Sequence, residues 1–374
     1  MKSITSFVCQ ECGYDSPRFM GKCPECGLWN TLKEFKIQKS NSKNTSLNAL
    51  SNKSAEPPRL ISDINHEKKN RITTGISEMD TVMGGGIVAG SVTLLAGDPG
   101  IGKSTLLLQV ALNLSLSSSR GPSFAKASAG RPASRESVIS HQSSVISHSV
   151  LYVSGEESES QVKLRAERLS KNLGKNKLFL VSSTDPDEIV NILEKLAPAF
   201  AVIDSIQTMA SENLEGLSGS IGQIRYSTTQ FIRAAKTLNI PVFLVGHVTK
   251  EGMVAGPMTL SHMVDTVLFL EGEKNTGTRI LRSLKNRFGP VDEVGIFAMQ
   301  GKGMVEVANP QSLFLDKANN APGSVLTVTL EGTRAFLVEI QALVVYSKLP
   351  MPRRVASGID YKRMELLLAV LQKH

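Results

Sequence analysis

Apolar residues gather in five short continuous runs along the chain, at residues 91–96, 150–153, 199–203, 241–245 and 266–270. Helical patterns lie between the earlier runs. Continuous apolar runs of this length are typical of strands that are buried on both faces. Such strands, alternating with helices, predict an α/β domain with a parallel sheet covered on both faces. In a sheet of this kind the ligand site lies at the carboxyl ends of the strands.

A glycine-rich segment joins the first predicted strand to a predicted helix over residues 105–112. From Gly97 to Ser104 it fills every fixed position of the phosphate-binding pattern G-x-x-x-x-G-K-[ST]. Glycines let backbone N–H groups wrap a polyphosphate, and the helix N-terminus adds the positive end of its dipole. We expect Lys103 to bind the β- and γ-phosphates and Ser104 to hold Mg²⁺. The predicted nucleotide-binding residues are Gly97, Asp98, Pro99, Gly100, Ile101, Gly102, Lys103, Ser104 and Thr105.

Polar side chains follow three of the later strands at their carboxyl ends. Asp204 fits the acidic residue that helps to hold Mg²⁺ in phosphate-loop enzymes. Glu156 or Glu157 fits a carboxylate that orients or deprotonates an attacking water, and His247 fits a sensor of the γ-phosphate. Each of them alone is equally well a solvated polar group at a strand end. Their convergence with Lys103 on one edge of the sheet favours the catalytic interpretation.

The four cysteines of the chain form two C-x-x-C pairs within the first 26 residues, at Cys9, Cys12, Cys23 and Cys26. Four thiolates brought together by two tight turns suit a tetrahedral Zn²⁺ ion. Two disulfides or uncoordinated thiols are the alternatives. The clustering favours a local metal site in a reducing, cytoplasmic compartment over a disulfide framework. With no coordination position left for water, the sequence predicts a structural zinc.

The formal net charge of +8 favours an anionic partner only weakly, because many proteins carry a solvated basic face. No apolar stretch reaches membrane-spanning length, so a membrane partner is not expected. Residues 37–70 are rich in Ser, Asn and Lys and predict a flexible linker. Residues 117–149 are serine-rich and of low complexity, which indicates a surface insertion.

The chain resembles the bacterial RadA (Sms) family of DNA-repair ATPases, zinc-bearing relatives of RecA. The segments that carry this resemblance are 21–31, 84–90, 97–104, 152–158, 246–252 and 285–289. The last of them, Lys-Asn-Arg-Phe-Gly, is the family's signature. The resemblance covers nearly the whole chain except the linker and the serine-rich insertion.

The resemblance implies an α/β fold with a RecA-like phosphate-loop core, an N-terminal zinc ribbon and a C-terminal Lon-protease-like domain. The implied parts are a four-cysteine zinc module at 1–36, the linker at 37–70, the core at 71–310 with its insertion at 117–149, and an incomplete Lon-like domain at 311–374. The Ser–Lys dyad region of a Lon-type protease is absent from this sequence, so proteolysis has no support.

The family further implies ATP-driven work on single-stranded and branched DNA, including branch migration, with ATP, Mg²⁺ and Zn²⁺ as cofactors. It implies a hexameric ring where the C-terminal domain is complete, and it allows a recombinase partner. Glu156 is the better candidate for the catalytic carboxylate, because RecA-like relatives carry glutamate at that offset from the strand. Alternatives are a replicative-helicase-like motor, or a non-catalytic switch in which ATP only sets the affinity for DNA or a partner.

Four cations are candidates for contacts with DNA or with a neighbouring subunit. By the resemblance, Lys285 and Arg287 act across a subunit boundary or on DNA, although a pair of surface cations on a turn is the plain alternative. We expect DNA contacts in two glycine-rich and polar stretches, taken as loops, of which the first includes Arg225 and the second Lys250.

Overall fold

The computed structural model describes residues 5–9, 14–25, 27, 29–36, 60, 71–116, 149–171, 173–175, 177–247, 260–272, 277–307, 322–346, 348 and 353–373. The chain divides into two compact units, Met1–Ala308 with Leu330–Arg334, and Asn309–Thr329 with Ala335–His374. Apart from Leu60 and Ser149, the predicted linker and insertion lie outside the described residues.

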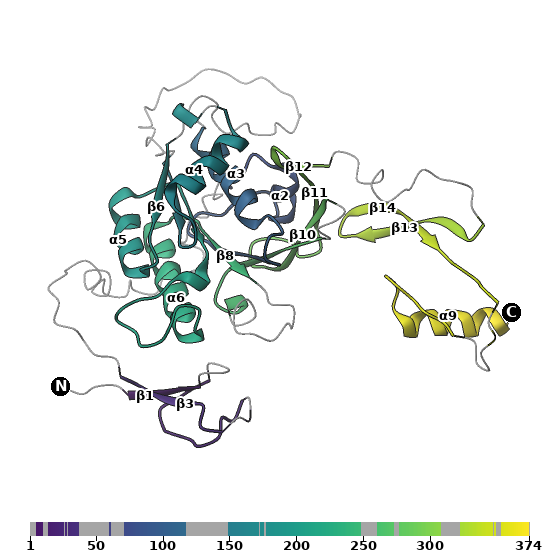
Figure 1. Cartoon of the computed structure of the whole chain (residues 1–374), viewed down its shortest axis with the longest axis horizontal. Helices are drawn as coiled ribbons and strands as arrows, with labels where there is room; N and C mark the ends of the chain where they lie inside the picture. The colour runs from purple at the N-terminus through teal and green to yellow at the C-terminus, as the bar shows by residue number, and fades with distance from the viewer. Residues whose placement is uncertain are drawn as a thin grey trace. The chain divides into compact units, whose positions relative to one another are not determined.

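A nine-stranded sheet forms the centre of the first unit (Figure 1). In spatial order its strands are β12 (Gly303–Glu306), β11 (Val294–Gln300), β10 (Thr278–Asn286), β9 (Thr266–Glu271), β4 (Val92–Gly97), β8 (Val242–His247), β7 (Phe200–Asp204), β5 (Val150–Ser154) and β6 (Leu178–Ser182). The six strands from β9 to β6 are parallel, and β10, β11 and β12 extend the sheet in antiparallel fashion. All five predicted strands are confirmed, whereas β6 and the antiparallel extension were not predicted.

Helices cover both faces of this sheet, as predicted. One apolar core contains residues of α2 (Ser77–Val82), α3 (Lys103–Ser115) and α4 (Glu159–Leu169). The other contains residues of α5 (Pro186–Leu196) and α6 (Ile221–Leu238). No helix among the described residues is long and apolar enough to cross a membrane.

The first stretch that was predicted to be a DNA-contacting loop is largely helical. Helix α6 begins at Ile221, so Arg225 lies within the helix, where it is exposed. Ile224 and Phe231 share a face with Ile221 and are buried in the core, and this apolar stripe stabilises the helix. The loop prediction was therefore wrong from Ile221 onward, because three nearby glycines concealed the helical period.

The N-terminal residues form a separate small sheet, in the order β2-β1-β3, from β1 (Thr5–Cys9), β2 (Asp15–Ser16) and β3 (Leu32–Lys36). The strands are antiparallel. In the C-terminal part of the chain, β13 (Ser324–Glu331) pairs with β14 (Arg334–Gln341), and α9 (Tyr361–Lys373) follows.

Candidate active site

The glycine-rich loop leaves the carboxyl end of β4 and enters α3, as its sequence pattern predicts. Gly97 and Gly102 have φ values of 152° and 112°, in the region that favours glycine. A Cβ atom on Gly97 would also clash with the backbone carbonyl of Leu270 on the adjacent strand β9. The loop therefore requires glycine for its own backbone path as well as for the approach of a phosphate.

Lys103 begins helix α3 and is only 3% exposed. Its Nζ donates to the carbonyls of Gly97 at 2.8 Å and Asp98 at 2.9 Å, and lies 3.1 Å from Nδ1 of His247. Burial lowers the pKa of Lys103 to about 8, and nearby carboxylates, Asp204 foremost, oppose that shift. The ammonium is thus held at the loop by weak carbonyl partners, which a polyphosphate can replace with stronger charge-assisted bonds.

His247 connects this lysine to a carboxylate. Its Nε2 lies 3.3 Å from Oε1 of Glu156, and the same oxygen accepts a hydrogen bond of 2.6 Å from the Ser205 hydroxyl. Because the Lys103 ammonium can only donate to Nδ1, the imidazole proton is assigned to Nε2, the ring nitrogen in polar contact with Glu156. Lysine, imidazole and carboxylate therefore form one continuous polar chain at the strand ends.

The two adjacent glutamates have different partners. Glu156 contacts His247 and Ser205, whereas Glu157 pairs with Arg165 of α4. Of the two carboxylates, that of Glu156 therefore lies in the polar chain that begins at Lys103.

Asp204 ends β7 and is 7% exposed. Its Oδ2 accepts a hydrogen bond of 2.6 Å from the hydroxyl of Tyr152. Asp204 and the half-buried Ser104 supply a carboxylate and a hydroxyl, the hard oxygen donors that Mg²⁺ prefers. The donor chemistry therefore fits the magnesium ion that the sequence predicts there.

Three residues at this site were not predicted. Tyr152 and Ser205 bind the two carboxylates, and Arg279 of β10 donates from Nε to the carbonyl of Ile101 in the phosphate loop at 3.1 Å. Tyr152 carries a usable signal, because it places a hydroxyl in an otherwise apolar strand. Arg279 carries none, since β10 was not predicted.

The structure places Lys285 and Arg287 at the opposite edge of the sheet. Lys285 Nζ donates to the carbonyls of Ser261 at 2.6 Å and Val264 at 2.8 Å. Arg287 pairs with Asp265 at 3.1 Å, and Asp265 also accepts from the backbone N–H at the start of β4. The phosphate loop leaves the other end of that six-residue strand, about 17 Å away at the usual rise. These cations are therefore remote from the phosphate loop of their own chain.

Of the remaining candidates, Lys250, Cys12 and Cys26 lie outside the described residues. Cys9 and Cys23 are 1% and 0% exposed and share one small buried cluster with Leu32. After Cys23 the chain turns back through a hydrogen bond from Gly27 N to the Cys23 carbonyl, with Gly27 at a φ of 73°. Two buried thiols brought together beside a tight turn fit the soft ligand set of a zinc ribbon.

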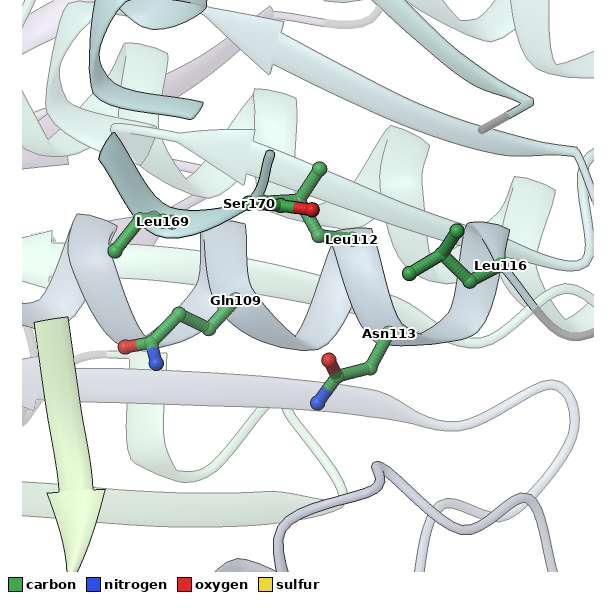
Figure 2. Close-up of a pocket in the computed structure, with 6 residues that line it drawn as sticks. All are labelled: Gln109, Leu112, Asn113, Leu116, Leu169 and Ser170. Carbon is green, nitrogen blue, oxygen red and sulfur yellow. The ribbon is translucent and has the colours of Figure 1, made fainter. Parts of the chain in front are cut away.

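Figure 2 shows the residues that line a small pocket along the second half of α3. It is lined by Gln109, Leu112, Asn113, Leu116, Leu169 and Ser170. At about 110 Å³ it is smaller than the pockets of roughly 300–1,000 Å³ that hold small-molecule ligands. None of its six lining residues belongs to the candidate nucleotide site, so the pocket is distinct from that site.

Comparison with known proteins places the chain among DNA repair proteins. Sequence models of the AAA domain and of the rubredoxin metal binding domain match residues 56–253 and 7–34. Over its whole length the chain is 45% identical to DNA repair protein RadA of Bacillus subtilis and 43% identical to that of Listeria monocytogenes, spanning 75% and 74% of those proteins. A crystal structure of the RadB recombinase aligns with 63% of this chain and 99% of its own, at 23% identity and a TM-score of 0.45. On its similarity to these full-length relatives, the chain belongs to the RadA family of DNA repair proteins, with a RecA-like core and an N-terminal zinc ribbon.

Proposed function

We propose that this protein is a DNA-stimulated ATP hydrolase that processes single-stranded and branched DNA during recombinational repair. The observation that carries the proposal is the polar chain from Lys103 through His247 to Glu156, beside Asp204 at the carboxyl edge of the sheet. The repair function named in the B. subtilis and L. monocytogenes relatives supports the same assignment.

Each residue of the polar chain, and of the metal site beside it, has a role that follows from its contacts. Lys103 exchanges the loop carbonyls for the β- and γ-phosphates, and Glu156 orients the attacking water and accepts its proton. Asp204 and Ser104 hold Mg²⁺, which neutralises charge on the phosphate oxygens. His247 lies between Lys103 and Glu156, so a γ-phosphate that draws Lys103 away also releases His247. We infer that His247 reports the γ-phosphate to the rest of the protein.

Coupling to DNA requires cations outside this site. Arg287 has a half-exposed side chain, and Lys285 is bonded to carbonyls beside it. Because both are remote from their own phosphate loop, we propose that Arg287 contacts DNA or a neighbouring subunit and that Lys285 supports it. Arg225 and Lys250 are proposed DNA contacts in a ring-shaped assembly, with a recombinase as a further partner.

We propose that the four cysteines bind one structural Zn²⁺ per chain. The match of residues 7–34 to a metal-binding family and the burial of Cys9 and Cys23 support this assignment. Metal analysis of the purified protein should give one zinc per chain, and a preparation with no zinc would contradict it.

The test of the hydrolase is phosphate release with and without a single-stranded oligonucleotide, for the wild type, Lys103→Ala and Glu156→Gln. The proposal expects DNA to raise the rate of the wild type and both variants to lose turnover. Nucleotide and DNA binding without turnover, in the wild type, would support the ATP-dependent switch instead. Turnover that is indifferent to Glu156→Gln would assign the base to another residue.

A further inference from the structure

A buried tyrosine and the carboxylate at the end of the next strand form a short hydrogen bond at the candidate metal site. Tyr152 lies in the middle of β5, is 1% exposed and belongs to the apolar core beneath α3. Its hydroxyl reaches Oδ2 of Asp204 at 2.6 Å. A backbone hydrogen bond also joins the ends of β5 and β7, because Gly155 N donates to the Asp204 carbonyl at 2.7 Å.

The direction of this bond follows from the two groups that form it. A carboxylate oxygen accepts hydrogen bonds, so the buried phenol hydroxyl is the donor. Among the described residues no hydrogen bond to Oδ1 of Asp204 is present, so one oxygen is committed to the fold and the other is available to a ligand.

The second carboxylate of the site is held in the same way by a different hydroxyl. Ser205 is fully buried, and its Oγ donates to Oε1 of Glu156 at 2.6 Å. The two acids thus have separate hydroxyl donors, from β5 for Asp204 and from the residue after β7 for Glu156. Because a hydrogen bond from a hydroxyl to a charged carboxylate is among the stronger ones in proteins, each donor fixes the rotamer of its acid.

We propose that Tyr152 is a positioning residue for Mg²⁺, whose hydroxyl fixes the Asp204 carboxylate so that Oδ1 meets the ion. Ser205 performs the corresponding task for Glu156 and the attacking water. The two hydroxyls therefore separate metal binding from water activation. This inference rests on the proposed function, because it assigns Asp204 to the metal.

A purely structural role for the tyrosine makes a different prediction. If the bond only satisfied a buried phenol, its removal would lower the unfolding temperature and leave the metal requirement unchanged. Tyr226 offers a matched control, because its hydroxyl also donates to an aspartate, Asp187, at 3.0 Å, away from the site.

The experiment uses the full chain and the variants Tyr152→Phe, Ser205→Ala and Tyr226→Phe, with Mn²⁺ as a spectroscopic substitute for Mg²⁺. Electron paramagnetic resonance measures the Mn²⁺ concentration that half-saturates the protein in the presence of ADP. Fluorescent ADP binding in EDTA and thermal unfolding show whether each variant retains its fold. None of these measurements requires turnover, so they remain informative if the hydrolase proposal fails.

We expect Tyr152→Phe to raise the half-saturating Mn²⁺ concentration roughly tenfold, while ADP binding in EDTA stays within twofold. Ser205→Ala should leave the Mn²⁺ requirement within twofold and lower the rate of ATP hydrolysis at saturating Mg²⁺. Tyr226→Phe should change neither quantity. An unchanged Mn²⁺ requirement in Tyr152→Phe would overturn the inference, as would an equal rise in Ser205→Ala or Tyr226→Phe. Absence of turnover in the wild type, with the Mn²⁺ effect present, would overturn only the hydrolase assignment.

Discussion

The two edges of the central sheet carry similar polar residues but use them differently. At the carboxyl edge, the His247 imidazole lies between Lys103 and the Glu156 carboxylate, and Lys103 also donates to backbone carbonyls of the phosphate loop. At the opposite edge, Lys285 donates to main-chain carbonyls, and Arg287 pairs with Asp265, which accepts from the backbone N–H at the start of β4. A polyphosphate can rearrange the first arrangement because it competes for the Lys103 ammonium. At the second edge Lys285 stabilises the fold, and the half-exposed Arg287 is the proposed contact with DNA or a neighbouring subunit. The surroundings of each cation therefore distinguish the nucleotide-binding edge from an edge that positions an external contact.

The largest effect should come from Lys103→Ala. Removing the ammonium that binds the phosphates should lower ATP turnover on the order of 10³-fold, because a preorganised charge in a water-excluded site is worth several kcal/mol. Phosphate release measures it, and thermal unfolding should show an intact fold. A variant that keeps a tenth of the wild-type rate would contradict the assignment of this edge.

The next effect concerns the loop that holds this lysine. Gly97→Ala should destabilise the protein by about 2–4 kcal/mol, since the new Cβ meets a backbone carbonyl that cannot rotate away. Gly301→Ala, where the added Cβ meets open space, is the matched control and should stay within about 0.5 kcal/mol. Urea unfolding compares the two, and equal midpoints would show that the loop tolerates a side chain.

At the opposite edge, Lys285→Met should lower stability by about 1–3 kcal/mol, because it leaves partly buried carbonyls without their donor while keeping the aliphatic stem. Nucleotide affinity of the folded protein should be unchanged. A loss of ADP affinity larger than threefold, measured by fluorescence titration, would remove the distinction between the two edges.

The pKa of Lys103 gives the binding edge a pH signature. With that pKa lowered to about 8, the ammonium is charged below pH 8 and is lost as pH rises through that value. Bound phosphates raise the pKa again, so ADP affinity should be constant below pH 8 and fall above it, by up to about tenfold per pH unit. Lys103→Arg stays charged and should give a flat profile over the same range. A profile for the wild type that is flat from pH 7 to 9.5 would mean that Lys103 does not titrate there.

The smallest effect is expected at Arg225 on α6. If it contacts a DNA phosphate, Arg225→Ala should weaken binding of single-stranded DNA a few-fold and make the salt dependence shallower by roughly 0.7 in log–log slope. Fluorescence anisotropy across a salt series provides the measurement, with Thr229→Ala on the same helix as control. Parallel salt slopes for Arg225→Ala and the wild type would exclude the contact.

The sequence was most informative where chemistry and periodicity coincide. The phosphate-loop pattern, the five apolar runs and the positions of Glu156, Asp204 and His247 at strand ends all predicted one edge of one sheet, and the structure brings those residues together. The strands of a parallel sheet all have their carboxyl ends at the same edge. Polar residues at those ends can therefore be placed together without knowledge of the packing.

The parts that were missed depend on contacts between segments far apart in sequence. Strand β10 alternates buried and partly buried positions and pairs antiparallel with β9, and no local sequence motif predicts this pairing. The donation from Tyr152 to Asp204 follows from the pairing of β5 with β7, more than 50 residues apart. In α6, glycines typical of loops concealed a helix that tertiary burial stabilises. Such features are set by the assembled core, which a single sequence does not display.

The central claim, that the carboxyl edge hydrolyses ATP with Glu156 as the base, is tested most directly by single-turnover hydrolysis with enzyme in excess over ATP and single-stranded DNA present. We predict that Glu156→Gln binds ATP within a few-fold of the wild-type affinity and hydrolyses it at least about 100-fold more slowly. A Glu156→Gln variant that binds ATP and hydrolyses it at the wild-type rate would contradict the claim.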